Sequence, residues 1–204
     1  MTRILGFETS CDETGVAVIE DGRRIIASDV ASQIPIHAQF GGVVPEIASR
    51  QHTQCISQLA RHVLDQAGSP VDAVAATIGP GLMGSLMVGV NFAKALAYVW
   101  RLPFVPVHHL EGHLFSVFLS ETPPEFPFVA LVVSGGHTSL IECRKPHEYK
   151  TLGATRDDAV GECFDKVARL LKLPYPGGPS IQKAAEKGDR SEERRVGKEC
   201  RSRW

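Results

Sequence analysis

His109 and His113 stand four positions apart, directly after an apolar run at residues 104–107. If a helix begins there, both imidazoles project from one face at a spacing suited to binding one divalent metal ion. Two histidines at this spacing can equally be plain polar residues at a helix start, and the pair alone leaves that alternative open. The other polar segments of the chain bear on the choice.

Residues 8–14 form a polar segment with three carboxylates and three hydroxyls. Hydroxyl and backbone N–H groups can contact phosphate, whereas carboxylates can hold a hydrated metal ion or receive a proton. The alternative is that this segment is only a polar hairpin turn.

A second polar segment, residues 133–138, contains Ser134, Gly135 and Gly136. Paired glycines let backbone N–H groups approach a phosphate closely, and the hydroxyls of Ser134 and Thr138 add donors. The segment is neither a P-loop nor a GxGxxG motif, and a Gly-Gly hairpin turn is the alternative.

Two further segments are rich in glycine. Residues 79–84 precede a long apolar run. If that run is a helix, its first N–H groups could hold an anion. We favour the alternative that the glycines of residues 79–84 allow close packing of the helix on the sheet. Residues 176–179 follow Asp165. Small residues there could admit a ribose whose hydroxyls donate to Asp165, or they could simply end a helix.

The elements that must position these segments follow from the spacing of apolar and turn residues. Strands are predicted at residues 3–7, 15–19, 24–30, 72–78 and 104–107, with helices at residues 45–68 and 82–100. After a proline-rich link at residues 123–127, strands are predicted at 128–133, 138–143 and 149–152, and a helix at 158–171. The second set repeats the three strands that open the first.

This order predicts an α/β protein with two related lobes and a ligand cleft between them. We expect a first lobe at residues 1–122 and a partial second lobe at 123–189 that stops after its first helix, as in a chain cut short. Residues 190–204 carry six basic and three acidic side chains and few apolar ones. We expect a disordered or non-native tail, with a basic arm that binds nucleic acid as the alternative.

Composition narrows the class of protein. The chain has 204 residues, of which 43% are hydrophobic, enough to form sizeable cores. It has no apolar run of about 18 residues and no signal peptide, which predicts a cytoplasmic protein that does not enter the membrane. Its five cysteines include no Cys-x-x-Cys, which argues against a disulfide framework and against a thiolate zinc site.

Seven motifs in this order resemble those of the tRNA threonylcarbamoyladenosine transferase family, once labelled O-sialoglycoprotein endopeptidase. They are ETSCDET (8–14), GGVVPE (41–46), GPGL (79–82), HLEGH (109–113), VSGGHT (133–138), FDK (164–166) and YPGGP (175–179). The resemblance implies a two-lobed fold of the actin, sugar-kinase and Hsp70 type, the actin-like ATPase (ASKHA) fold. It also implies transfer of a threonylcarbamoyl group from threonylcarbamoyl-AMP to N6 of the adenosine beside the anticodon (position 37), in tRNAs that read codons starting with A.

The resemblance also implies roles for individual residues. His109 and His113 match the metal-binding histidines, with Fe²⁺ or Zn²⁺ as the ion. Asp12 and Glu13 are candidates for orienting the incoming amine or accepting its proton. The implied partners are tRNA, a TsaB-like homologous lobe protein and a TsaE-like ATPase. The positions that match substrate-binding residues are Val132, Val133, Ser134, Gly135, Gly136, Asp165 and Gly178.

The chain also departs from the family pattern. The family's third protein ligand to the metal, an aspartate, and an asparagine-containing nucleotide motif lie in a C-terminal region that this sequence does not contain. Catalytic metal sites normally use about three protein ligands. We therefore expect the chain as written to bind metal poorly and to transfer little.

Two alternative functions come from other classes. A metalloprotease would carry H-E-x-x-H, but here Glu111 is two residues after His109, about 200° around a helix, and so points away from the metal. A non-catalytic lobe that pairs with a homologous partner is the other alternative.

Overall fold

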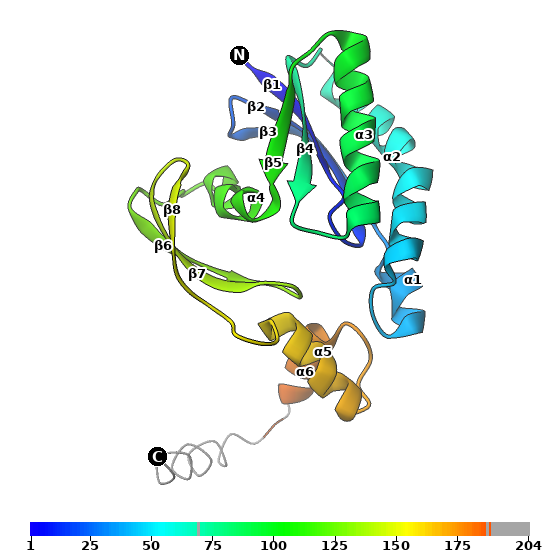
Figure 1. Cartoon of the computed structure of the whole chain (residues 1–204), viewed down its shortest axis with the longest axis vertical. Coiled ribbons are helices and arrows are strands. Elements are labelled where there is room, and N and C mark those ends of the chain that lie inside the picture. The colour runs from blue at the N-terminus through cyan, green and yellow to red at the C-terminus, as the bar shows by residue number, and fades with distance from the viewer. Residues whose placement is uncertain (69, 187, 189–204) are drawn as a thin grey trace.

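The described part of the chain contains two β-sheets linked by a short helix, with further helices packed on the first sheet and following the second (Figure 1). The structure is a computed structural model and describes residues 1–68, 70–186 and 188. The architecture is α/β, as predicted. The tail predicted at residues 190–204 lies outside the described residues. None of the helices in the described part of the chain is both long and apolar enough to cross a membrane.

The first sheet has five strands in the order β3-β2-β1-β4-β5. β2 pairs antiparallel with β1 and β3, whereas β4 runs parallel to both β1 and β5. Each strand lies within two residues of its predicted bounds, because apolar runs between turn residues mark them clearly. The strands are β1 (Arg3–Glu8), β2 (Glu13–Glu20), β3 (Arg24–Ser32), β4 (Ala73–Gly79) and β5 (Phe104–His108).

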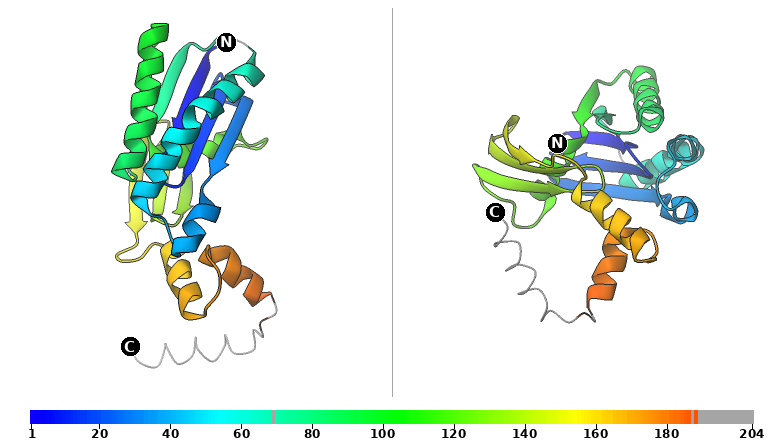
Figure 2. Two further views of the ribbon diagram at one scale, coloured as in Figure 1. Left: turned by 90° about the vertical axis from the view of Figure 1, so that its right-hand side faces the viewer. Right: turned by 60° about the horizontal axis from the view of Figure 1, so that its bottom comes forward.

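Helices α2 (Pro45–Ala67) and α3 (Met83–Trp100) cover one face of this sheet (Figure 2). Because side chains alternate along a strand, Leu5 and Phe7 of β1 point into the core beneath these helices. Their neighbours Ile4, Gly6 and Glu8 face the opposite side, which borders a hollow of about 540 Å³. Glu8 therefore leaves the core at the carboxyl end of the strand.

The second sheet is an antiparallel meander in the order β6-β7-β8. Its strands are β6 (Phe128–Val133), β7 (Thr138–Lys145) and β8 (Glu148–Ala154). Helix α4 (His109–Ser116) leaves β5 and packs Leu110 and Leu114 against Val132, Ile141 and Cys143 of this sheet. The predicted boundary at residue 122 places α4 in the first lobe, whereas its apolar side chains belong to the core of the second sheet.

Two helices follow the second sheet, α5 (Val160–Leu170) and α6 (Gly177–Ala185). The prediction that this lobe stops after one helix is wrong. The Gly-Gly-Pro segment resembles a helix breaker, but it forms the first turn of α6, where backbone N–H groups need no helical partner. Gly177 is required there because a Cβ atom would lie 2.4 Å from the carbonyl oxygen of Phe164.

Three short helical segments were also not predicted, because each is too short to show a helical period. They are α1 (Ile34–His37) and the 3₁₀ turns Ala38–Phe40 and Val117–Leu119.

Candidate metal and nucleotide site

The histidine pair lies at the start of α4. His108 is extended and His109 is the first helical residue, so the prediction that a helix begins here is confirmed. Side chains four residues apart share a helix face, and the Nε2 atoms of His109 and His113 lie 3.1 Å apart. The predicted convergence of the two imidazoles on one point is confirmed as well.

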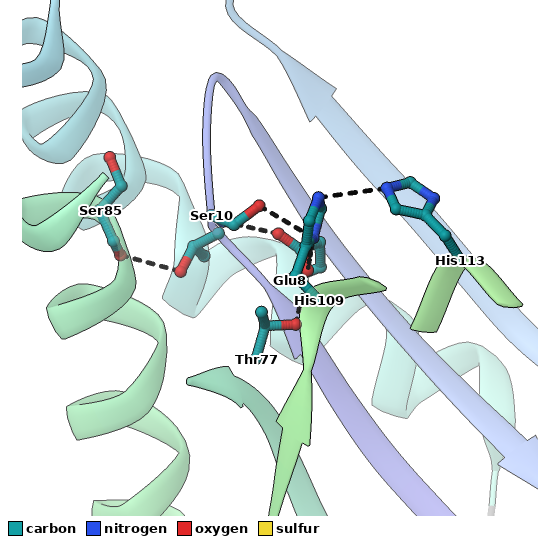
Figure 3. A network of polar contacts seen from close by, with 7 residues as sticks. Glu8, Ser10, Thr77, Ser85, His109 and His113 are labelled. Atoms are coloured by element: carbon teal, nitrogen blue, oxygen red, sulfur yellow. Dashed lines mark hydrogen bonds and ion pairs between the residues drawn. The ribbon is translucent and has the colours of Figure 1, made fainter. Parts of the chain in front are cut away.

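A carboxylate stands behind this pair (Figure 3). Oε2 of Glu8 lies 3.3 Å from Nδ1 of His109 and accepts a hydrogen bond from the hydroxyl of Thr77. Oε1 of Glu8 accepts from the backbone N–H of Ser10 at 2.6 Å, and Oγ of Ser10 lies 3.2 Å from Nδ1 of His109. Glu8 was predicted only as one of three carboxylates in the polar segment 8–14, with no role of its own. Its role comes from its place at the end of β1, because β4 and β5 end beside it in the sheet.

The pKa shifts at this site favour neutral His113 and His137 and an ionised Glu8. Burial raises the pKa of Glu8, but hydrogen bonds from His109, Ser10 and Thr77 outweigh it and lower that pKa to about 2. The pKa of His113 is lowered by burial and by the neighbouring charge of His109, and the pKa of His137 is lowered for the same two reasons. Only neutral imidazoles bind metal ions.

The donor set fits a divalent metal ion in part. Two imidazole nitrogens bound to one ion at about 2.0–2.1 Å are separated by about 3 Å, which matches the 3.1 Å between the Nε2 atoms. A carboxylate behind a ligating histidine is also the common arrangement in metal sites. Among the described residues, however, no third histidine, cysteine, aspartate or glutamate completes a group.

The turn between β6 and β7 faces the histidine pair. The ring centres of His109 and His137 are 6.1 Å apart. Gly135 and Gly136 are exposed, as a phosphate cradle requires, but Oγ of Ser134 already accepts from the N–H groups of Gly136 and His137 within the turn. The side chain of Val132 lies in the core, while Val133 is about half exposed (48%). These five positions remain predicted substrate contacts, and the structure shows in addition that Ser134 bonds within the turn and that Val132 packs in the core.

Asp165 and Gly178 lie together at the junction of α5 and α6. Oδ1 of Asp165 accepts a hydrogen bond from the N–H of Gly177 at 2.7 Å, so one carboxylate oxygen anchors the start of α6. Gly178 is the next residue of the same helical turn. A hollow of about 320 Å³ opens beside Asp165 and Tyr175.

The predicted catalytic carboxylates, Asp12 and Glu13, stand in the turn before β2 and at the first residue of that strand. No hydrogen bond joins Asp12 or Glu13 to either imidazole among the described residues, and Glu13 is exposed at the start of β2. The pKa of Tyr175, which precedes α6, is raised by burial and by the charges of Asp12 and Asp165. The carboxylate at the histidine pair is Glu8.

A buried polar network holds the segment that carries Asp12. The ring of His52 is fully buried, and its Nε2–H donates to the carbonyl oxygen of Cys11 at 3.0 Å. Its Nδ1 then accepts from the hydroxyl of Thr14 at 2.7 Å. Gln33 links His52 to the second fully buried histidine, His37. The network fixes the tautomer of His52 and ties α2 to the turn before β2.

Glu111 lies in the first turn of α4, two positions after His109. Burial raises the pKa of Tyr149 in β8, and the charge of Glu111 contributes to that rise. That Glu111 points away from a metal at His109 stays a prediction, based on the rotation of about 200° between the two positions on a helix.

Comparison with known proteins establishes the family. A family model described as TsaD, tRNA N6-adenosine threonylcarbamoyltransferase, matches residues 24–201. Curated proteins with that name from Caldicellulosiruptor bescii and Anaeromyxobacter dehalogenans are each 56% identical, over 91% and 93% of this chain. The chain spans only 56% and 58% of the length of these two relatives.

A solved structure supports the fold assignment. The ethanolamine utilization protein EutJ from Carboxydothermus hydrogenoformans superposes with a TM-score of 0.52 at 18% identity, over 97% of this chain and 65% of that one. The fold is that of the actin-like ATPases, as the resemblance implied. The match of the family model and the identity to the curated relatives confirm the resemblance itself, and the chain belongs to the tRNA N6-adenosine threonylcarbamoyltransferase family.

Proposed function

We propose that this chain carries the histidine pair and the nucleotide-facing turns of a tRNA-modifying acyltransferase. The enzyme moves a threonylcarbamoyl group from threonylcarbamoyl-AMP to N6 of the adenosine beside the anticodon, in tRNAs that read codons starting with A. Family membership supports this function. The observation that carries it is the pair of converging imidazoles with Glu8 behind them.

His109 and His113 would hold the metal ion, Fe²⁺ or Zn²⁺, through their Nε2 atoms. When bound, the ion supplies Lewis acidity toward the carbamoyl oxygen and orients the acyl-adenylate. Glu8 keeps His109 directed at the ion position, and the lowered pKa of His113 keeps that ring neutral and available at pH 7.

The remaining residues would bind the nucleotide and manage the proton. Backbone N–H groups of Gly135 and Gly136 would contact the phosphate, and the free oxygen of Asp165 would accept from a ribose hydroxyl. Transfer forms a bond between N6 and the carbamoyl carbon, breaks the bond from that carbon to the phosphate oxygen, and releases AMP. Asp12 or Glu13 would take the proton that N6 loses.

The chain alone is expected to be a weak enzyme. Two imidazoles are fewer than the three protein ligands of an ordinary catalytic site, so we propose that residues 1–204 bind the ion weakly and transfer little. The partners we propose are tRNA, a TsaB-like protein that resembles one lobe, and a TsaE-like ATPase, in the cytoplasm.

A chimera tests this proposal. Residues 1–189 would replace the matching segment of the Caldicellulosiruptor bescii relative, and the product would be incubated with tRNA, threonylcarbamoyl-AMP and Fe²⁺. We expect threonylcarbamoyladenosine, detected by mass spectrometry of tRNA digests, from the chimera but not from its His109→Ala form. A folded chimera that leaves tRNA unmodified, or a His109→Ala chimera that works as well, would refute the proposal.

A further inference from the structure

We propose that Glu8 is a positioning residue that sets the tautomer of His109. This inference rests on the proposed function only in that the pair His109–His113 binds a metal ion. Its content is separate: which nitrogen of His109 carries the proton, and which residue decides it.

Both oxygens of Glu8 are held as acceptors. The backbone N–H of Ser10 donates to Oε1 at 2.6 Å, and the hydroxyl of Thr77 donates to Oε2. An ionised carboxylate has no proton to give. The Nδ1 atom of His109, 3.3 Å from Oε2, must therefore carry the hydrogen of that contact.

The consequence appears at the other ring nitrogen. A neutral imidazole with hydrogen on Nδ1 has a lone pair on Nε2. That Nε2 atom faces Nε2 of His113 at 3.1 Å, the position where a shared ion would sit. Glu8 thus leaves the metal-facing nitrogen of His109 free of hydrogen before any ion arrives.

Ser10 is the competing partner. Its Oγ atom lies 3.2 Å from Nδ1 of His109. A hydroxyl can donate as well as accept, so Ser10 alone is compatible with either tautomer. The carboxylate of Glu8 can only accept a hydrogen bond, so it selects the tautomer of His109 that carries hydrogen on Nδ1.

The strand order makes Glu8 the residue in position to do this. β4 lies between β1 and β5, and all three run parallel. The carboxyl ends of these strands lie at one edge of the sheet. Glu8 ends β1, Thr77 lies near the end of β4, and His109 directly follows β5, so the three side chains meet there (Figure 3). The side chain of His109 is only 19% exposed, which leaves its Nδ1 few other partners.

Glu8→Gln offers a sharp test because the backbone dictates how the new amide must lie. The N–H of Ser10 is a fixed donor, so the amide oxygen of the variant has to face it. The amide NH₂ group then faces Nδ1 of His109 and donates to it, which moves the ring hydrogen to Nε2. Loss of a carboxylate behind a ligating histidine typically lowers metal affinity by about 10–100-fold.

The experiment uses chain 1–204 as wild type, Glu8→Gln, Ser10→Ala, His109→Ala and His113→Ala. ¹⁵N NMR of the metal-free imidazoles reports the tautomer, and calorimetric titration with Zn²⁺ reports affinity. We expect hydrogen on Nδ1 of His109 in wild type and in Ser10→Ala. In Glu8→Gln we expect hydrogen on Nε2 and about 10–100-fold weaker zinc binding.

Two results would overturn the inference. One is a wild-type His109 that carries its hydrogen on Nε2. This measurement uses the wild-type protein alone, so it does not depend on any variant folding. The other is a Glu8→Gln protein with unchanged tautomer and affinity, including the case in which Ser10→Ala changes both. If instead His109→Ala and His113→Ala bind zinc as wild type does, the proposed metal site fails, while the tautomer result still decides the role of Glu8.

Discussion

Oε2 of Glu8 lies 3.3 Å from Nδ1 of His109, although 101 positions separate the two residues in the chain. The contact forms because β1, β4 and β5 run parallel and end at the same edge of the sheet. The geometry of the histidine pair therefore depends on the alignment of three strands as well as on the helix that carries both imidazoles.

Gly161→Ala should displace the predicted phosphate cradle. A Cβ atom on Gly161 would lie 2.8 Å from the Cα atom of Gly135 and from the carbonyl oxygen of Ser134, and neither backbone atom can yield easily. We expect weaker AMP binding by calorimetry and a loss of about 1–3 kcal/mol in the free energy of unfolding from overpacking.

Gly153→Ala is the matched control for that variant. Nothing lies within 4 Å of its added Cβ atom, so both AMP binding and stability should stay near wild type. If Gly161→Ala binds AMP as well as Gly153→Ala does, the turn at Ser134–Gly136 is not the phosphate site.

Leu114→Ala should destabilise the protein strongly, because α4 belongs to the core of the second sheet. Leu114 is 5% exposed and packs with Val132 and Ile141. Truncating a buried leucine costs about 2–5 kcal/mol, which urea denaturation measures directly. Leu170→Ala, at a position 82% exposed, should change the free energy by only about 0.5 kcal/mol. Equal losses in the two variants would show that α4 does not belong to that core.

Stability should fall as the pH drops below about 6.5, partly through His52. Burial lowers the pKa of His52 in the folded protein. As the pH falls, the unfolded chain therefore binds a proton before the folded protein does, and the free energy of unfolding decreases. Urea denaturation from pH 8 to pH 5 should show this slope, and His52→Gln should reduce it. An unchanged slope in the variant would mean that folding does not lower the pKa of His52.

Much of the fold could be predicted from local pattern. The strands β1 to β8 and the helices α2, α3 and α5 appear within two residues of their predicted bounds, because apolar period and turn residues are local signals. Helix α6 was missed because its glycines resemble a helix breaker. The reason for Gly177 is a contact distant in sequence, since the chain passes close to the backbone of Phe164 there.

The site was predictable only where its residues are close in sequence. The spacing of His109 and His113 on one helix is such a case. The role of Glu8 was missed because it comes from strands brought together across the sheet, which no spacing in the sequence reveals. The packing of α4 on the second sheet is likewise a long-range contact that the local pattern does not reveal.

The most direct test of the account is X-ray absorption at the zinc edge of zinc-loaded chain 1–204. We predict two imidazole nitrogens at about 2.0–2.1 Å, with oxygen ligands completing the shell and no sulfur. That imidazole signal should be lost in His109→Ala/His113→Ala and kept in His62→Ala, an exposed histidine on α2. A shell dominated by sulfur at about 2.3 Å, or an imidazole signal that survives the double substitution, would contradict the assignment of His109 and His113 as the metal site.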